Sequence, residues 1–331
     1  MNERARRVQG VGRGLALAAA GSIAFSGKAI IVKLAYRYGV DAVTLIMYRM
    51  LFALPLFVAL AWWAGRGKPA LERRDLLVVA GLGFSGYYLA SFLDFAGLQF
   101  ITASLERLIL YLNPTLVLLL GVLVMRQRAR PRQLIALAVS YCGVLLVFGH
   151  ELSFSGAHTA LGAALVFGSA VSYAVYLVLS GNEVKRLGAL RLTGWATSVA
   201  CVLCIAQFLL LRPLAAAAVA PAVLWLSLLN ATLCTFAPVV MVMLAIERIG
   251  ATLTAQTGMI GPVSTILMGV LILGEPINAW IIAGTIAVLL GVWLLMNHPR
   301  SAFGASHLGG TAGGPPEPVP RRPPGGTNSR H

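Results

Sequence analysis

Apolar residues in this chain fall into long stretches, and most arginines and lysines lie in the short segments between them. Each stretch is close to the about 20 residues that a helix needs to cross a hydrocarbon core of about 30 Å. The pattern predicts an all-α polytopic membrane protein with ten transmembrane helices, at 14–36, 42–64, 76–98, 100–125, 133–149, 159–182, 192–212, 222–246, 250–273 and 277–296.

Composition and charge support this class. Of the 331 residues, 58% are hydrophobic and 11% are charged, whereas a soluble domain carries about 25% charged residues. With the N-terminus in the cytoplasm, nearly all the basic residues behind the net charge of +15 share one side, and only Arg37 and Arg212 lie opposite. Cytoplasmic loops carry an excess of Lys and Arg. We therefore expect an inner (plasma) membrane protein with both termini cytoplasmic and no affinity for nucleic acid.

Three segments have alternative interpretations. The basic start also fits a secretory signal peptide, whose cleavage would leave nine helices. Cys201 and Cys204 have redox or metal spacing, but no second pair or nearby His accompanies them, so we interpret them as helix-packing residues. Residues 298–331 are rich in Gly and Pro and predict a disordered cytoplasmic tail, although "PPEPVPRRPP" would also fit a polyproline-binding groove.

The two halves of the chain match each other at an offset of 148 residues. Pro114 aligns with Pro262, and the "GVL" that starts at Gly121 aligns with the one that starts at Gly269. Because each half has five helices, an odd number, the second half must enter the membrane in the opposite sense. Inverted repeats of this kind build many secondary transporters, with the substrate site near the midplane where the halves meet.

Two motifs carry a family resemblance. One is "FSGKAIIVK" from Phe25, followed by Tyr48-Arg49; the other is Gly274-Glu275-Pro276 between the last two helices. They resemble the first two helices and the closing motif of the EamA family of the drug/metabolite transporter superfamily. The resemblance covers residues 14–297. It implies ten helices in two inverted five-helix repeats, a central cavity, and export or exchange of small metabolites across the inner membrane.

The same resemblance sets the expected domain boundaries. They are a cytoplasmic N-terminal segment at 1–13, a first repeat at 14–149, a periplasmic connector at 150–158, a second repeat at 159–297 and the tail at 298–331. The first half departs from the family pattern at Arg126-Gln127-Arg128, where a Gly-Glu type is usual, and Lys28 stands where a small amide is common. These departures bear on the substrate more than on the fold.

Six ionisable residues lie inside predicted helices, where each costs about 2.5–3.5 kcal/mol and usually faces a cavity or a partner. Helical rise places five of them in one layer of the outer half, about 10 Å from the helix starts where they lie on helices two and four, with Lys28 about 7–8 Å deeper. We expect Lys28, Arg49 and Glu106 to handle a solute or a proton, and Lys33, Asp94 and Arg107 to form ion pairs of an outer gate. A purely structural ion-pair network is the alternative.

Uncharged polar residues extend this candidate site. Asn113 shares a helical face with Glu106, and the second half offers Tyr176, Asn230 and Gln256 in place of charges. Such residues also serve as interhelical packing and hydrogen-bonding groups. Together with Lys28 they suit a small anionic or zwitterionic solute with an apolar part, such as an amino acid.

The sequence thus predicts a secondary transporter that moves a small metabolite by alternating access, with efflux favoured. The alternatives are an importer or exchanger of another small solute or drug, and a membrane sensor or scaffold. All five histidines lie outside the apolar stretches, which argues against an intramembrane enzyme. We expect no catalytic residues, no metal and no cofactor; the expected partners are a small-molecule solute and the lipid bilayer, and a homodimer is left open.

Overall fold

The computed structural model describes residues 3–123, 131–155 and 157–296, and within these ranges the regular structure is helical, without strands. Ten helical segments in them are long and apolar enough to cross a membrane. Their ends lie within four residues of the predicted ones, so the predicted fold class is confirmed. The predicted tail at 298–331 lies outside the described residues.

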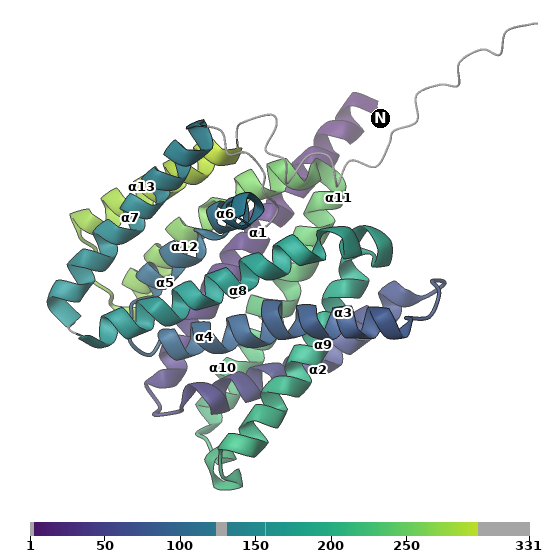
Figure 1. Ribbon diagram of the computed structural model, residues 1–331, viewed down its shortest axis with the longest axis horizontal. Coiled ribbons are helices and arrows are strands. Elements are labelled where there is room, and N and C mark those ends of the chain that lie inside the picture. Colours follow the sequence, from purple (N-terminus) through teal and green to yellow (C-terminus); the bar gives the residue numbers. More distant parts are fainter. Residues whose placement is uncertain (1–2, 124–130, 156, 297–331) are drawn as a thin grey trace, which may run out of the picture.

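The first half contains five spans (Figure 1). The first two are α1 (Glu3–Tyr36) and α2 (Ala42–Gly65). The third joins α3 (Arg73–Gly83), a π-helical turn η1 (Phe84–Leu89) and α4 (Ala90–Gly97). The fourth is divided into α5 (Ala103–Leu110) and α6 (Asn113–Leu123), and the fifth is α7 (Pro131–Ser155).

The second half repeats this order. It begins with α8 (Ala157–Leu187), α9 (Ala189–Leu211) and a short 3-10 turn η2 (Leu214–Ala217). Its third span joins α10 (Pro221–Ala231), the π-helical turn η3 (Thr232–Phe236) and the first part of α11 (Ala237–Gly258), up to the sharp turn at Gly250 (φ 79°). The fourth span joins the rest of α11 to α12 (Ile260–Met268) and η4 (Gly269–Leu273), and the fifth is α13 (Ala279–Met296).

The structure reproduces the 148-residue offset in its irregularities. The turns η1 and η3 begin at Phe84 and Thr232, which are 148 residues apart, and α5 and α11 end at Leu110 and Gly258, also 148 apart. Matching breaks at matching positions show that the halves share one backbone plan.

Proline explains the break in the fourth span of each half. Pro114 and Pro262 cannot donate a backbone hydrogen bond, and each ring clashes with the carbonyl four residues earlier, which belongs to Leu110 or Gly258. Both freed carbonyls find a side-chain donor: Nδ2 of Asn113 donates to the Leu110 oxygen at 2.7 Å, and the Tyr111 hydroxyl donates to the Gly258 oxygen. Broken helices in a membrane need such partners because lipid supplies none.

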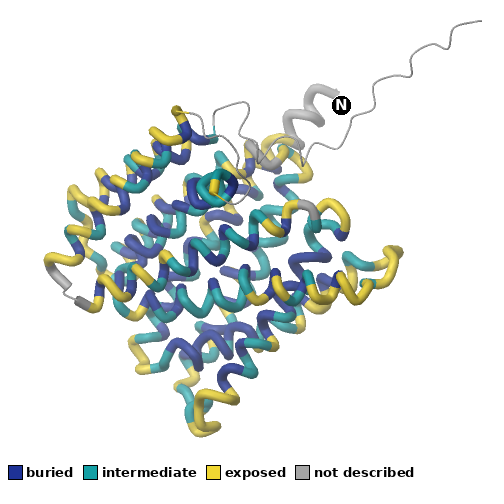
Figure 2. The backbone as a smooth tube through the Cα atoms, in the orientation of Figure 1, coloured by how far each residue is buried: buried dark blue, intermediate teal, exposed yellow. Residues whose placement is uncertain are grey.

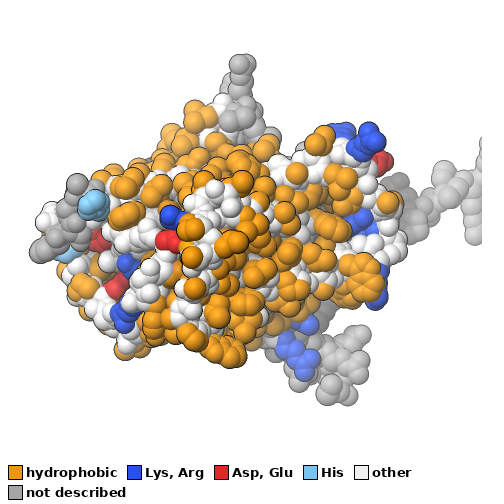
Figure 3. All heavy atoms as spheres, turned by 90° about the horizontal axis from the view of Figure 1, so that it is seen from below, with side chains coloured by type: hydrophobic (Ala, Val, Ile, Leu, Met, Phe, Trp, Pro, Cys, Tyr) orange, Lys and Arg blue, Asp and Glu red, His pale blue; other side chains and the backbone are white. Residues whose placement is uncertain are grey.

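The packing of the two halves has the same inverted symmetry. Corresponding helices pair directly, α2 with α9 and α7 with α13, while α1 packs on α11 and α12 as α8 packs on α4 and α6 (Figure 1). Buried positions concentrate toward these shared faces (Figure 2). Outside them, hydrophobic side chains cover the middle of the face in Figure 3, and most charged side chains lie toward its two ends. This surface suits a lipid environment.

Two of the segments expected to flank the repeats contain helix. Most of the expected connector at 150–158 is helical, since α7 continues to Ser155 and α8 begins at Ala157. The expected N-terminal segment at 1–13 also contributes to a helix, because α1 begins at Glu3.

Close backbone contact between α7 and α13 generates a prediction. A Cβ atom at Gly284 would lie 2.6 Å from the carbonyl oxygen of Gly143, so Gly284→Ala forces the two helices apart. We expect a loss of about 1–3 kcal/mol in stability, measured by thermal unfolding in detergent. Gly81→Ala is the matched control, since a Cβ there meets no described atom within 4 Å and alanine favours the helix. Equal unfolding temperatures for both variants would refute this account of the contact.

Candidate functional site

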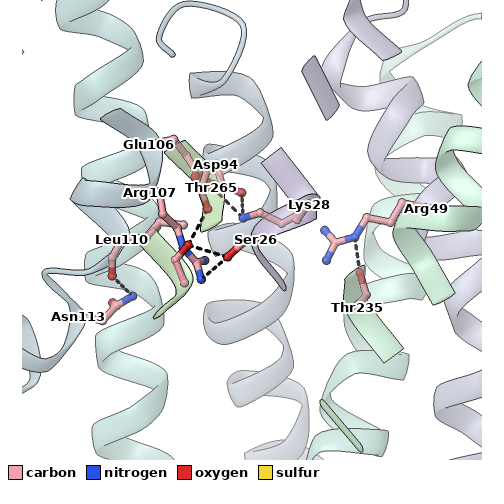
Figure 4. A network of polar contacts seen from close by, with 11 residues as sticks. Ser26, Lys28, Arg49, Asp94, Glu106, Arg107, Leu110, Asn113, Thr235 and Thr265 are labelled. Atoms are coloured by element: carbon pink, nitrogen blue, oxygen red, sulfur yellow. Dashed lines mark hydrogen bonds and ion pairs between the residues drawn. The ribbon is translucent and has the colours of Figure 1, made fainter. Parts of the chain in front are cut away.

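Lys28 of α1, Asp94 of α4 and Glu106 of α5 form a buried ion cluster where the three helices meet (Figure 4). The Nζ atom of Lys28 lies 2.5 Å from Oδ2 of Asp94 and 3.0 Å from Oε1 of Glu106. The Asp94 and Glu106 side chains are only 4% and 1% exposed. Charges this deeply buried must be paired, because desolvation is costly.

This cluster differs from the expected gate pairs. Within the described residues, the carboxylates of Asp94 and Glu106 pair with Lys28, and neither Lys33 nor Arg107 forms an ion pair. The depth predicted for Lys28 from helical rise is the depth of its backbone. Its flexible stem instead carries the ammonium to the carboxylates, as lysine side chains do when they extend toward polar surroundings.

One ammonium does not satisfy two carboxylates. The Oδ1 atom of Asp94 and both carboxylate oxygens of Glu106 are buried without a hydrogen-bond partner. Lys28 approaches Oε1 of Glu106 within ion-pair distance, but at an angle that leaves no hydrogen bond. A buried acceptor without a donor is costly, so the carboxylates of this cluster can accept one more proton or hydrogen bond.

Arg49 of α2 is a second buried cation with spare bonding capacity. Its Nε donates to Oγ1 of Thr235 at 3.1 Å, and its guanidinium lies 5.1 Å from the centre of the Phe95 ring, next to Asp94 in the chain. Its Nη1 is buried without a partner. Thr235 belongs to η3 and donates in turn to the carbonyl of Asn230, so the π-helical turn of the second half orients Arg49.

Arg107 points away from the ion cluster, toward the broken helix of the second half (Figure 4). It donates to Oγ of Ser26 at 3.4 Å, and Ser26 donates to the Gly261 carbonyl at 2.8 Å. A Cβ at Gly261 would lie 2.6 Å from the guanidinium. Arg107 thus lies against the α11–α12 break, where a cation complements the carbonyl end of α11.

The remaining expected site residues are placed apart from the ion cluster. Asn113 satisfies the Leu110 carbonyl at the α5–α6 break, and Asn230 is 1% exposed with its Oδ1 unpartnered. Tyr176 belongs to a different apolar cluster, in which its hydroxyl lies 3.1 Å from that of Tyr87. Gln256 is half-buried in α11.

A cavity of about 760 Å³ opens beside the ion cluster. It lies between the end of α1, the start of α2, the α4–α5 turn and residues 273–276, and we call it the vestibule. Lys33, Thr102 and Glu275 are among its lining residues, whereas Lys28, Asp94 and Glu106 are not. Glu106 lies one turn below Thr102, whose carbonyl accepts its backbone N–H. The vestibule therefore ends close above the ion cluster.

Asp41 lies at the rim of the vestibule, at the start of α2. Partial burial alone would raise the pKa of Asp41, but hydrogen bonds from the side chain and backbone of Thr44 and the nearby Arg212 lower it below its usual value. Arg212 ends α9 and lies 3.1 Å from the carboxylate, so this pair joins the two halves at the vestibule end.

The sequence interpretation missed the partners that the second half supplies. Thr235 lies 186 residues from Arg49, and Gly261, whose carbonyl accepts from Ser26, lies 235 residues from it. Periodicity within one helix carries no signal for such contacts. Among the described residues, no group of three His, Cys, Asp or Glu side chains is arranged to hold a metal ion.

Fold and site together define a class: a ten-helix membrane protein of two inverted repeats with charged groups buried between its helices. Residues 12–149 and 160–297 each match the model of the EamA-like transporter family, and the chain belongs to this family. It is a membrane transporter of small solutes.

Named relatives agree with this assignment. Over 264 residues, the chain is 31% identical to the uncharacterized transporter YcbK of Bacillus subtilis, covering 77% of this chain and 83% of that protein. Over 139 residues it is 30% identical to the chloramphenicol-sensitive protein RarD of Pseudomonas aeruginosa, covering 37% and 44%. A solved crystal structure at 18% identity has a TM-score of 0.59, covers 85% of this chain and 95% of its own, and supports the fold.

The ion cluster generates a second prediction. Lys28→Met leaves two buried carboxylates without their cation, and we expect a loss of about 3–5 kcal/mol in stability, measured by thermal unfolding in detergent. Adding Asp94→Asn to that variant should restore part of the loss, because it removes one of the uncompensated charges. Lys33→Met is the matched control on the same helix, outside the cluster. A further loss on adding Asp94→Asn would contradict the pairing.

Proposed function

We propose that this transporter exports a small zwitterionic amine, an amino acid or a related solute, by alternating access. The observation that carries the proposal is the pairing of spare acceptors and a spare donor in one buried region. Asp94 and Glu106 have carboxylate oxygens without donors, and Arg49 has a nitrogen without an acceptor. An ammonium and a carboxylate on one solute supply both missing partners.

Binding energetics support a charged solute over a neutral one. Hydrogen bonds to ionised groups are roughly twice as strong as neutral ones, and a site with buried unpaired groups rejects solutes that leave them unpaired. The Phe95 ring beneath the Arg49 guanidinium adds apolar surface beside these charges. An α-amino acid combines these three features within a few bonds.

Topology supports the expected orientation and an alternating-access mechanism. The distribution of Lys and Arg favours cytoplasmic termini in the inner membrane, which makes the vestibule the outer opening. Inverted repeats support alternating access by rocking one half against the other around the site between them. The family and the named relatives are transporters, which supports a transport role rather than an enzymatic one.

The same carboxylates suit coupling to protons. In the absence of solute, a proton satisfies one of the orphaned oxygens of Glu106; a bound ammonium takes that place and releases it. Solute export would then be linked to proton entry, with one proton exchanged for one ammonium.

Solute flux from vesicles tests the proposal. The full chain is reconstituted in vesicles, each loaded with one labelled solute from a panel of amino acids, neutral solutes and purely anionic solutes, and flux is followed with and without a pH gradient. We expect flux of at least one free amino acid, none of its N-acetylated form, and acceleration when the trans side is acidic. Flux of neutral or purely anionic solutes alone, or of none in the panel, would overturn the proposal.

Arg49 and Glu106 then give separate predictions within that assay. Arg49→Gln should raise the KM for the transported amino acid about 30-fold or more, because it removes a buried charged partner. Glu106→Gln should abolish the effect of the pH gradient. Arg74→Gln, on the exposed first turn of α3, is the control and should leave both unchanged. An unaltered KM in Arg49→Gln would remove Arg49 from the site.

A further inference from the structure

We propose that Glu275 is a positioning residue that holds the helix α5 closed over the ion cluster and so forms the outer gate. Glu275 belongs to the second half, whereas α5 belongs to the first and carries Glu106. The contact between them crosses the boundary between the repeats at the floor of the vestibule. Breaking it frees α5 to move, and with it one wall of the ion cluster.

The contact is a carboxylate on the amino end of a helix. Oε1 of Glu275 accepts the backbone N–H of Ala103 at 2.7 Å, while Oε2 accepts the hydroxyl of Ser104 at 2.9 Å and its backbone N–H at 3.3 Å. The first N–H groups of a helix have no partner within it, and an anion there also complements the helix dipole. We call these three hydrogen bonds the Glu275 latch.

Local backbone geometry presents Glu275 in this place. Gly274 ends η4 in the left-handed region (φ 74°), and the N–H of Glu275 donates back to the Gly269 carbonyl at 3.0 Å. Gly274 thus ends the helix in the left-handed conformation that favours glycine. Gly269 also leaves the space for the carboxylate, because a Cβ there would lie 2.9 Å from Oε2 of Glu275.

The helix that the latch holds is short and separately anchored. α5 has eight residues, and the break at Tyr111–Leu112 disconnects it from α6. At its other end, Tyr111 and Arg107 contact the α11–α12 break, also in the second half. Both ends of α5 therefore depend on the second half, so a rocking motion of the repeats changes its position.

The latch also separates the vestibule from the ion cluster. Thr102 and Glu275 line the vestibule, and Glu106 lies one turn further along α5. Cys234 of η3 lies beside the backbone next to Lys28: it is buried, and a Cβ at Gly27 would be 3.0 Å from its sulfur. Cys234 is thus a native reporter for water entering past the latch.

The inference rests on the alternating-access function proposed above, but its test follows the reactivity of one thiol and uses no solute. The full chain, with Cys142, Cys201 and Cys204 replaced by Ala, is placed in lipid nanodiscs and treated with a charged, membrane-impermeant maleimide. In Glu275→Gln we expect Cys234 to react about tenfold faster, because the latch loses its charge-assisted hydrogen bonds. A failure of the transport experiment and a failure of the labelling experiment can therefore be distinguished.

Glu151→Gln is the matched control. Glu151 of α7 accepts a hydrogen bond from the Thr102 hydroxyl, so it is a carboxylate at the same end of α5, but within the first half. Glu151→Gln should leave the labelling rate of Cys234 within about twofold of the parent, since the hydrogen bond between Thr102 and Glu151 is not part of the Glu275 latch. An unchanged rate in Glu275→Gln, or an equal rise in Glu151→Gln, would overturn the proposal.

A second reporter distinguishes gating from unfolding. Cys204, kept as the single cysteine in a sister protein, is buried between α2 and α9 and should stay protected in Glu275→Gln. If both reporters become reactive, Gly269→Ala decides, because it displaces the Glu275 carboxylate and leaves its charge in place. Selective exposure of Cys234 in Gly269→Ala supports the gate. Exposure of both cysteines, or of neither, assigns Glu275 a structural role only and rejects the gate.

Discussion

A charge buried among apolar helices must find its counter-charge inside the protein, and the placement of Lys28 follows from that constraint. Its ammonium ties α1 to α4 and α5 through Asp94 and Glu106. Removing Lys28 leaves two carboxylates in a medium that cannot solvate them. The three helices therefore share one electrostatic centre, and the surplus carboxylate leaves that centre with acceptor oxygens that have no donor.

The same constraint acts on the backbone. Each half interrupts its fourth span at a proline, and an interrupted helix exposes carbonyls that lipid cannot satisfy. The first half satisfies its own break through Asn113, and it also supplies the donor for the other break through Tyr111. The two breaks thus occupy equivalent positions but have different hydrogen-bond donors. The hydrogen bond from Tyr111 to the Gly258 carbonyl couples the movement of the two repeats.

The two halves contribute different groups to the buried polar contacts. The first half supplies the charges, Lys28, Arg49, Asp94 and Glu106. The second half supplies groups that orient side chains of the first, Thr235 for Arg49 and the carbonyl of Gly261 for Ser26. Glu275 reverses the direction, because it is a charge of the second half that acts on a helix of the first. Its counterpart 148 residues earlier is Gln127, which carries no charge. The gate contact is thus a feature of one end of the molecule.

The sequence alone determined the fold class, the ten spans and the repeat. Hydrophobic length fixes where a helix crosses, the positions of Arg and Lys favour an orientation, and prolines that match at one offset reveal the symmetry; all are local properties that survive without tertiary contacts. The sequence also singled out the charged residues that form the ion cluster, since an ionisable group in an apolar stretch stands out by itself. It did not determine their partners.

Only the tertiary structure decided which charge meets which. Depth along a helix axis placed Lys28 below the carboxylates, but the reach of its side chain and the angle between α1, α4 and α5 bring them together. The same holds for Arg107. Its position on a helix face does not say which neighbour it meets, whereas the fold places it against the α11–α12 break. Pairing across helices depends on their rotation and crossing, and these arise from packing between residues that are distant in the chain.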